Sequence, residues 1–207
     1  MTNRLLVAIP MYLSVPVLWF CRWEEMDRTH VSGVVATRKL YLASAMQQMV
    51  SGSLERDDWD RLVVYEADML PPRDAFTRIA NYPDSLDIVG PVYFQHTSPH
   101  YPIVYNQADE EHYRALARNQ IDDMMAKPGL YPVDAVGLGF TSINRRVLEK
   151  WDPDIQMFGG EHKLGHDMWF CREAKRQNFD VHVDSAIECG HITELPITYE
   201  NTKTVGE

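Results

Sequence analysis

Cysteine is scarce in this chain, and its three cysteines are widely spaced. Cys21, Cys171 and Cys189 form neither a disulfide framework nor the paired spacing of a zinc ribbon, which favours a reducing compartment. We therefore expect a cytoplasmic protein, in the host cytoplasm if the source is viral. Long hydrophobic runs are also lacking. The longest, residues 12–21, contains a proline and is too short to span a bilayer, and no cleavable signal pattern precedes it, so we expect no membrane span.

Basic residues are outnumbered by acidic ones. The chain has 20 Lys and Arg against 30 Asp and Glu, which gives a formal net charge of −10 at pH 7. This balance argues against broad electrostatic binding to nucleic acid or to anionic membrane, although a local basic patch is compatible with it. With 207 residues and 45% hydrophobic content, the chain can bury a substantial core, and we expect a single globular domain.

The loop after the first predicted strand has no glycine. That strand covers residues 4–9, and the loop reads PMYLSV before a helix that starts near Pro16. A strand, loop and helix in this order commonly receive a nucleotide base, but the dinucleotide fingerprint and the P-loop both need glycines in the loop. A nicotinamide dehydrogenase and a P-loop kinase are therefore disfavoured.

The most informative stretch is DRLVVYEADMLPP, residues 60–72. Residues 62–65 are an unbroken apolar run, which is typical of a strand covered on both faces in a parallel sheet. Glu66 and Asp68 follow at once, although unpaired carboxylates are costly to bury, and Pro72 suits the first turn of a helix. An isolated E-x-D is more often a solvated turn. At the carboxyl edge of an open α/β sheet, however, such a loop lies where ligands bind.

The rest of the chain alternates between strand and helix patterns. Apolar runs predict strands at residues 33–36, 87–93, 131–143 and 181–186, and helical spacing predicts helices at residues 38–50, 110–126, 145–151 and 166–177. Residues 94–105 are rich in His, Pro and Tyr and read as a loop or short edge strand whose rings suit sugar or base stacking. The pattern predicts an α/β fold with a mostly parallel central sheet flanked by helices, which is a Rossmann-like arrangement.

Topology brings distant polar residues together at one edge of this sheet. If the helix at residues 166–177 starts at the carboxyl edge and runs away from it, the strand after it must return toward that edge. Asp167 and His191 then meet at the rim that also carries Asp68. Taken alone, each has a simpler explanation, since Asp stabilises helix amino termini and a loop His often bonds to a backbone carbonyl.

Two histidines at helical spacing precede that helix. His162 and His166 form an H-x-x-x-H pattern, but it lacks the glutamate of a metalloprotease motif, and Gly165 weakens the helix there. We interpret both as structural or substrate-loop residues rather than metal ligands.

Six segments occur in order along the chain: EAD with MLPP, DIVGPVY, VDAVGLGF, GHDMWFC, FDVHVD and CGH. Together they resemble glycosyltransferases of the GT-A fold, in particular the small family-2-like enzymes of bacteriophage and bacterial genomes. The resemblance covers about residues 4–191. It implies one GT-A-like domain over residues 1–207, with a nucleotide-binding half at 1–94, an acceptor and catalytic half at 95–191, and a C-terminal tail at 192–207.

The resemblance also implies roles for individual residues. The segment Glu66-Ala67-Asp68 corresponds to the family's D-x-D motif, so Asp68 would hold a divalent cation, Glu66 would contact the ribose or the metal shell, and His191 would complete the coordination. Asp167 would match the catalytic aspartate of the family's E-D motif. Two positions depart from the family pattern, because Glu66 replaces the usual first Asp and His166 stands where Glu is usual.

The implied chemistry agrees with the residue types. A carboxylate with an imidazole suits Mn²⁺ or Mg²⁺, and a hard cation stabilises the departing nucleotide diphosphate of a UDP- or GDP-sugar. Asp167 as general base predicts a single displacement with inversion. We expect the nucleotide to lie near Pro10, Met11, Tyr12 and Arg38, and the donor sugar or acceptor to lie near Asp134, Gly137, Leu138 and Gly139.

The sequence leaves the acceptor open and two other functions possible. The acceptor hydroxyl belongs to a glycan, a lipid, a protein or a modified base in DNA, and the acidic charge weighs against DNA. One alternative is a nucleotidyltransferase, although those enzymes usually carry a glycine-rich, basic loop where this chain has MYLSV. The other is a catalytically silent nucleotide-sugar-binding module, which the two departures from the family motifs make plausible.

Overall fold

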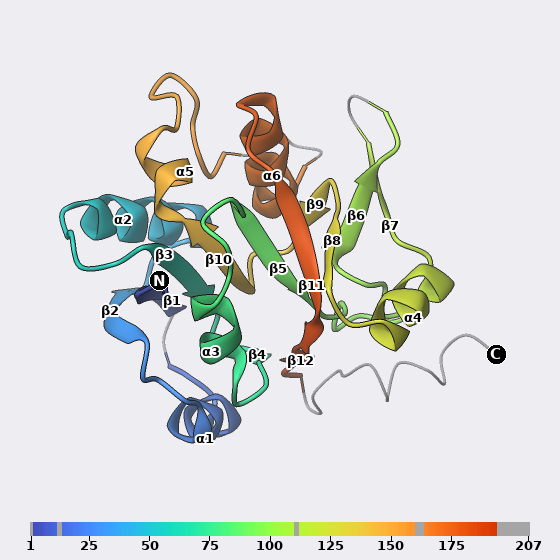
Figure 1. Ribbon diagram of the computed structural model, residues 1–207, viewed down its shortest axis with the longest axis horizontal. Helices are drawn as coiled ribbons and strands as arrows, with labels where there is room; N and C mark the ends of the chain where they lie inside the picture. The colour runs from blue at the N-terminus through green and yellow to red at the C-terminus, as the bar shows by residue number, and fades with distance from the viewer. Residues whose placement is uncertain (1, 12–13, 110–111, 160–163, 194–207) are drawn as a thin grey trace.

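The computed structural model describes residues 2–11, 14–109, 112–159 and 164–193. Within these residues, a seven-stranded sheet runs through the middle of the molecule in the order β2-β1-β3-β10-β5-β11-β8 (Figure 1). Its strands are β1 (Leu5–Met11), β2 (Val31–Arg38), β3 (Arg61–Tyr65), β5 (Ile88–Val92), β8 (Leu130–Pro132), β10 (Phe140–Asn144) and β11 (Val181–Glu188). β10 and β8 run antiparallel to their neighbours, and the other strands point the same way. The predicted α/β fold with a mostly parallel sheet is confirmed.

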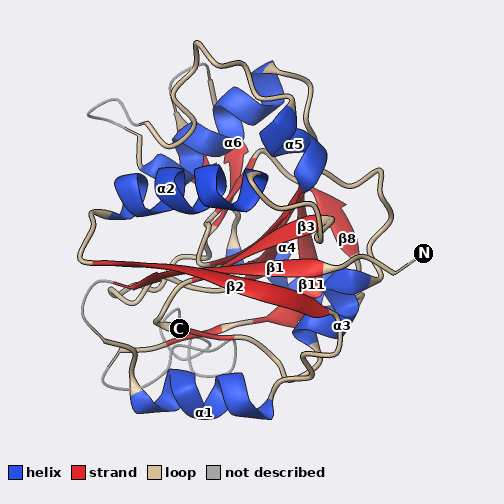
Figure 2. Ribbon diagram, turned by 90° about the vertical axis from the view of Figure 1, so that its left-hand side faces the viewer, coloured by secondary structure: helices blue, strands red, loops and turns tan. Residues whose placement is uncertain are grey.

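The central strand β3 is apolar after its first residue because both faces of the sheet are covered. On β3, Leu62 and Val64 face one hydrophobic cluster, Val63 and Tyr65 face the other, and all four are fully buried. Helices α2, α5 and α6 cover the first face, whereas α1 and α3 lie on the second (Figure 2). The helices are α1 (Val17–Glu25), α2 (Leu42–Leu54), α3 (Ala75–Ala80), α4 (Arg118–Ala126), α5 (Arg145–Glu149) and α6 (His166–Arg176). None of these described helices is long and apolar enough to cross a membrane.

Two smaller sheets flank the central one. In the first, β12 (Gly190–His191) pairs with β4 (Met69–Leu70), which joins the segment after β11 to the segment after β3. In the second, β6 (Val104–Gln107) lies between β7 (Tyr113–Ala115) and β9 (Ala135–Val136). The first of these sheets positions the candidate site.

Two predicted elements differ from the structure in kind, and the helix predicted at residues 38–50 is observed at Leu42–Leu54. The strand predicted at residues 131–143 is three strands, β8, β9 and β10, because its backbone changes partners. Val133 N–H donates to the Val181 carbonyl, and Asp134 N–H donates to the Tyr105 carbonyl. The helix predicted at residues 110–126 begins only at Arg118. Residues 113–115 form β7 instead, since β6 supplies a partner strand and apolar spacing over three residues does not separate helix from strand.

Candidate active site at the carboxyl edge of the sheet

The pairing of β4 with β12 places His191 beside Asp68. His191 lies opposite Met69 in the register, and the Ile192 N–H donates to the Asp68 carbonyl at 2.6 Å. His191 Nε2 is 3.2 Å from Asp68 Oδ2. The structure therefore brings these two predicted site residues together at the carboxyl ends of β3 and β11.

His96 joins this pair, and sequence reasoning missed it. His96 Nδ1 is 3.2 Å from His191 Nε2, and the candidate ligand atoms of Asp68, His96 and His191 all lie within 4.8 Å of one another. The histidines of residues 94–105, a segment with the pattern of a loop or short edge strand suited to stacking, are the sequence signal that could indicate a ligand there.

The three side chains fit a divalent cation. The Phe94 carbonyl accepts a hydrogen bond from His191 Nδ1 at 2.8 Å, which leaves the lone pair of Nε2 facing Asp68 and His96. Asp68 Oδ1 is buried and has no hydrogen-bond partner among the described residues. A buried carboxylate oxygen without a donor and an oriented imidazole together make a donor set for a metal such as Mn²⁺.

Carboxyl groups gather next to the three candidate metal ligands, Asp68, His96 and His191. Burial, together with the charges of Asp167 and Asp68, raises the pKa of Glu66 to about 8. Burial lowers the pKa of His191, but its hydrogen bonds with Asp68 and Phe94 outweigh burial and raise that pKa overall. Three carboxyl groups in one partly buried place favour a bound cation or proton.

Asp167 faces the same site from the first turn of α6. Its carboxylate Oδ1 lies 2.6 Å from His166 Nε2, and its charge acts on Glu66 across the site. Burial lowers the pKa of His166, but the contact with Asp167 more than offsets burial and raises it. Asp167, Asp68 and His191 each act electrostatically on Glu66, which places the three groups around one carboxyl, and their predicted roles stay predictions.

Tyr93 lies at the centre of this site and was also missed. Burial raises its pKa, and the Asp167 and Glu66 charges add to the shift, so the phenol stays neutral. Its hydroxyl accepts the Gly139 N–H at 3.3 Å, and its ring is 5.6 Å from that of His191, centroid to centroid. As the last residue of an apolar strand pattern, Tyr93 gave no signal beyond core packing.

The Gly137-Leu138-Gly139 segment is buried beside the site, and its predicted contact with the donor sugar or the acceptor stays a prediction. A Cβ on Gly137 would lie 1.9 Å from the Tyr93 hydroxyl, so the glycine makes room for that ring. Leu138 is fully buried in the core, and the Gly139 carbonyl accepts the Glu66 N–H at 2.8 Å. Asp134 is likewise engaged within the fold, where it pairs with Lys175 and accepts the Gln107 N–H.

A cleft opens beside the carboxylates of Glu66 and Asp68. It has a volume of about 310 Å³ and is lined by Pro10, Ser14, Pro16, Glu66, Ala67 and Asp68. Met11 ends β1 opposite Arg38, which is exposed at the end of β2. Tyr12 lies outside the described residues. The Trp19 indole donates to the Glu66 carbonyl at 3.0 Å and so fixes α1 against the acidic loop.

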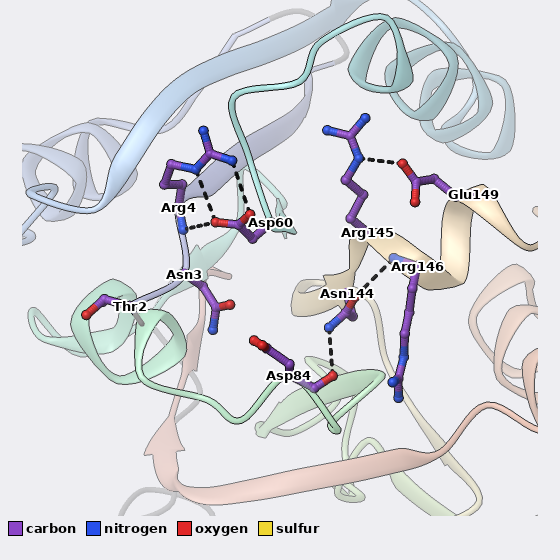
Figure 3. A pocket seen from close by; sticks show the side chains of 9 residues that line it. All are labelled: Thr2, Asn3, Arg4, Asp60, Asp84, Asn144, Arg145, Arg146 and Glu149. Carbon is purple, nitrogen blue, oxygen red and sulfur yellow. Dashed lines mark hydrogen bonds and ion pairs between the residues drawn. The ribbon is translucent and has the colours of Figure 1, made fainter.

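A larger cavity of about 680 Å³ lies at the opposite edge, where β1 and β3 begin (Figure 3). Its arginines are paired with carboxylates: Arg4 with Asp60 at 3.2 Å, Arg145 with Glu149 at 2.7 Å, and Arg146 with Asp87 at 2.6 Å. None of the predicted site residues lines this cavity, so we do not assign the reaction to it.

Two solved structures are similar to this one over most of the chain. A197 from STIV aligns with a TM-score of 0.68 and 21% identity, over 92% of this chain and 86% of that one. GalNAc-T7, solved with UDP, GalNAc and Mn²⁺, aligns with a TM-score of 0.62 and 12% identity, over 93% of this chain and 43% of that one. The fold is GT-A-like.

The GT-A fold thus agrees with the resemblance seen in the sequence. At these identities the two likenesses show the fold alone. The sequence matches no family model and no curated protein. Membership of a family-2-like group and a bacteriophage or bacterial source stay predictions.

Proposed function

We propose that this protein is a metal-dependent glycosyltransferase that moves a sugar from a nucleotide-sugar donor to an acceptor hydroxyl. The observation that carries the proposal is the convergence of Asp68, His96 and His191 beside Glu66 and Asp167 at the carboxyl edge of a GT-A-like sheet. The likeness to GalNAc-T7, solved with UDP, GalNAc and Mn²⁺, supports the same donor chemistry.

Asp68 and His191 would hold the cation, and His96 would add a third ligand. One carboxylate oxygen with two imidazole nitrogens favours Mn²⁺ over Mg²⁺, because Mg²⁺ prefers an all-oxygen shell. When bound, the cation would neutralise the negative charge of the departing nucleoside diphosphate. Glu66 lies in the cleft next to Asp68, where it would contact the metal shell or the donor ribose.

Asp167 would act as the general base. The acceptor hydroxyl oxygen forms a bond to the anomeric carbon as the bond from that carbon to the diphosphate oxygen breaks, and the hydroxyl proton passes to the Asp167 carboxylate. The nucleoside diphosphate leaves with the electron pair of the broken bond. His166, 2.6 Å from Asp167 Oδ1, would hold the carboxylate in position, and a single displacement of this kind inverts the anomeric centre.

The cleft between Pro10 and Asp68 would receive the nucleotide of a UDP- or GDP-sugar. Its volume of about 310 Å³ lies at the lower end of the range for small-molecule sites. Met11 and Arg38 would lie along its outer side, where β1 and β2 end.

The test separates binding from chemistry with two variants and a control. The protein is titrated with UDP and GDP with and without Mn²⁺, and it is then given a panel of UDP- and GDP-sugars while released nucleotide is measured. Asp68→Ala should abolish metal-dependent nucleotide binding, whereas Asp167→Asn should retain binding and lose turnover. Asp57→Ala, which removes an exposed carboxylate near the start of β3, should change neither.

Two outcomes would contradict the proposal. Equal loss of nucleotide binding in Asp68→Ala and Asp167→Asn would refute the division of roles. Binding of a nucleotide with Mn²⁺ but no turnover of any nucleotide sugar would identify a silent binding module instead of an enzyme.

A further inference from the structure

A second groove lies on the face of the sheet that α2 and α6 cover. It has a volume of about 420 Å³ and runs between α2 and residues 156–158. It is lined by Ala43, Ser44, Gln47, Gln48, Ser51, Gln156 and Phe158. None of these residues belongs to the metal cluster or the nucleotide cleft.

The described residues that line this groove carry no charge, although 24% of the chain is charged. All thirteen residues of α2, LASAMQQMVSGSL, are uncharged. Its buried side supplies Met46, Met49 and Val50 to the core, and its exposed side presents Ser44, Gln47, Gln48 and Ser51. Exposed helix faces usually carry Lys and Glu. This face instead offers hydroxyl and amide groups, which both donate and accept hydrogen bonds.

One wall of the groove packs against the helical turn that carries Asp167. The Gln156 carbonyl accepts the Trp169 indole N–H at 2.8 Å, and the Phe158 ring stacks on Phe170 with centroids 5.2 Å apart. Trp169 follows Asp167 by two residues in the first turn of α6. The other wall, α2, begins just after β2 ends at the carboxyl edge of the sheet. Both walls of the groove therefore adjoin helices, α2 and α6, that begin at the carboxyl edge of the sheet.

We propose that this groove binds the acceptor, and that the acceptor is a chain of neutral sugars. The inference rests on the proposed function, because it assigns the acceptor of the same site. Amide and hydroxyl side chains match the hydroxyl groups of uncharged sugars, each of which donates and accepts. A phosphate-rich acceptor such as DNA would need Lys or Arg, and a lipid surface would need exposed apolar or basic side chains. Among the residues that the structure describes, the groove lining provides neither an exposed large apolar side chain nor a cation.

The test uses direct binding of defined oligosaccharides. The full chain, with Mn²⁺ and UDP present, is titrated with the tetrasaccharides of glucose (α- and β-linked), mannose and N-acetylglucosamine. The wild type should bind at least one of them, and Gln47→Glu/Gln48→Glu should weaken that binding about tenfold or more. The substitution keeps side-chain size and helix propensity but removes amide donors and adds charge. Asn119→Glu, an equivalent change on an exposed position of α4, should leave it unchanged.

Nucleotide binding and donor hydrolysis, measured on the same variants, separate this inference from the proposed function. If UDP and Mn²⁺ bind and a donor is hydrolysed but no tetrasaccharide binds, the groove assignment is wrong and the transferase proposal stands. If a tetrasaccharide binds equally well to wild type and to Gln47→Glu/Gln48→Glu, the assignment is wrong as well. If tetrasaccharide binding depends on Gln47 and Gln48 while no nucleotide binds, the groove is a glycan site and the transferase proposal fails.

Discussion

His191 Nε2 lies 3.2 Å from Asp68 Oδ2, although 123 positions separate the two residues in the chain. The short pairing of β4 with β12 sets this contact, and the Phe94 carbonyl fixes the imidazole from its other nitrogen. An imidazole held on one side by a backbone carbonyl and offered on the other to a carboxylate is a common arrangement for a metal ligand.

Removal of the metal should lower the thermal stability of the protein. Mn²⁺ with UDP, each at about 100 times its dissociation constant, should raise the melting temperature, since a ligand in that excess stabilises the folded state by about 2.7 kcal/mol. A chelator should return the melting temperature to that of the untreated protein. A melting temperature that Mn²⁺ and UDP leave unchanged would argue against a preformed metal and nucleotide site.

His96→Ala should weaken Mn²⁺ binding about tenfold or more without unfolding the protein. His96 is exposed and contributes one of the three candidate ligand atoms, so its loss removes a metal contact but little packing. The affinity can be measured by titration of Mn²⁺ with UDP present. The matched control is His112→Ala, which removes an exposed imidazole that pairs with Asp109 outside the cluster. Equal affinity in His96→Ala and wild type would exclude His96 from the site.

Tyr93→Phe should lower the free energy of unfolding by about 1 kcal/mol. The hydroxyl accepts the buried Gly139 N–H at 3.3 Å, and its removal leaves that donor without a partner. Urea denaturation measures the change. Tyr41→Phe, at a tyrosine that is 87% exposed, should have no measurable effect. A Tyr93→Phe variant as stable as wild type would show that the Gly139 contact contributes nothing.

Alanine should have opposite effects at two glycines. Gly137→Ala should destabilise the protein by about 1–3 kcal/mol, because the new Cβ would lie 1.9 Å from the Tyr93 hydroxyl and 2.5 Å from Ile103 Cγ2. Gly52→Ala should stabilise it by about 0.5–1 kcal/mol, since Gly52 lies within α2 and its Cβ would meet open space. Both changes can be measured by urea denaturation. A neutral Gly137→Ala would mean that Tyr93 moves aside freely.

Asp27 should stabilise the protein more at neutral pH than in acid. Hydrogen bonds from the Thr29 hydroxyl and backbone N–H, and then from Thr77, lower the pKa of Asp27 from 3.8 to about 2. Because the folded pKa is below the unfolded one, the stabilisation is fully present above about pH 4 and is lost as the pH falls toward 2. Melting temperatures of wild type and Asp27→Asn should therefore differ at pH 6 and converge between pH 4 and pH 2. A difference that is constant over this range would refute the linkage.

The fold and the gathering of Asp68 and His191 could be predicted because they follow from patterns along the chain. The apolar run of β3 indicates burial on both faces, and the alternation of strands and helices then places both residues at one edge. His96 could not be found in this way. It follows β5 in a loop whose course depends on the pairing of Phe94 with Pro102, and no local pattern encodes that contact.

The Gly137-Leu138-Gly139 segment shows a second limit on what the sequence alone can predict. The glycines correctly indicated a close approach, but the sequence does not say what approaches. In the structure it is the Tyr93 ring, and Leu138 points into the core. A glycine is favoured whether a ligand or a neighbouring side chain approaches the backbone closely, so only the structure shows which of the two is present.

The pairing of β4 with β12 determines when the candidate metal site can form during synthesis of the chain. The candidate ligands come from residues 68, 96 and 191, and β11 fills its place between β5 and β8 only after residue 181 has been made. A nascent chain released after residue 68 but before residue 191 carries the acidic loop but lacks the imidazole of His191. Chains that end before His191 are therefore expected to bind no metal ion at this site. The ribosome would have to synthesise nearly all of the described residues before the site can bind an ion.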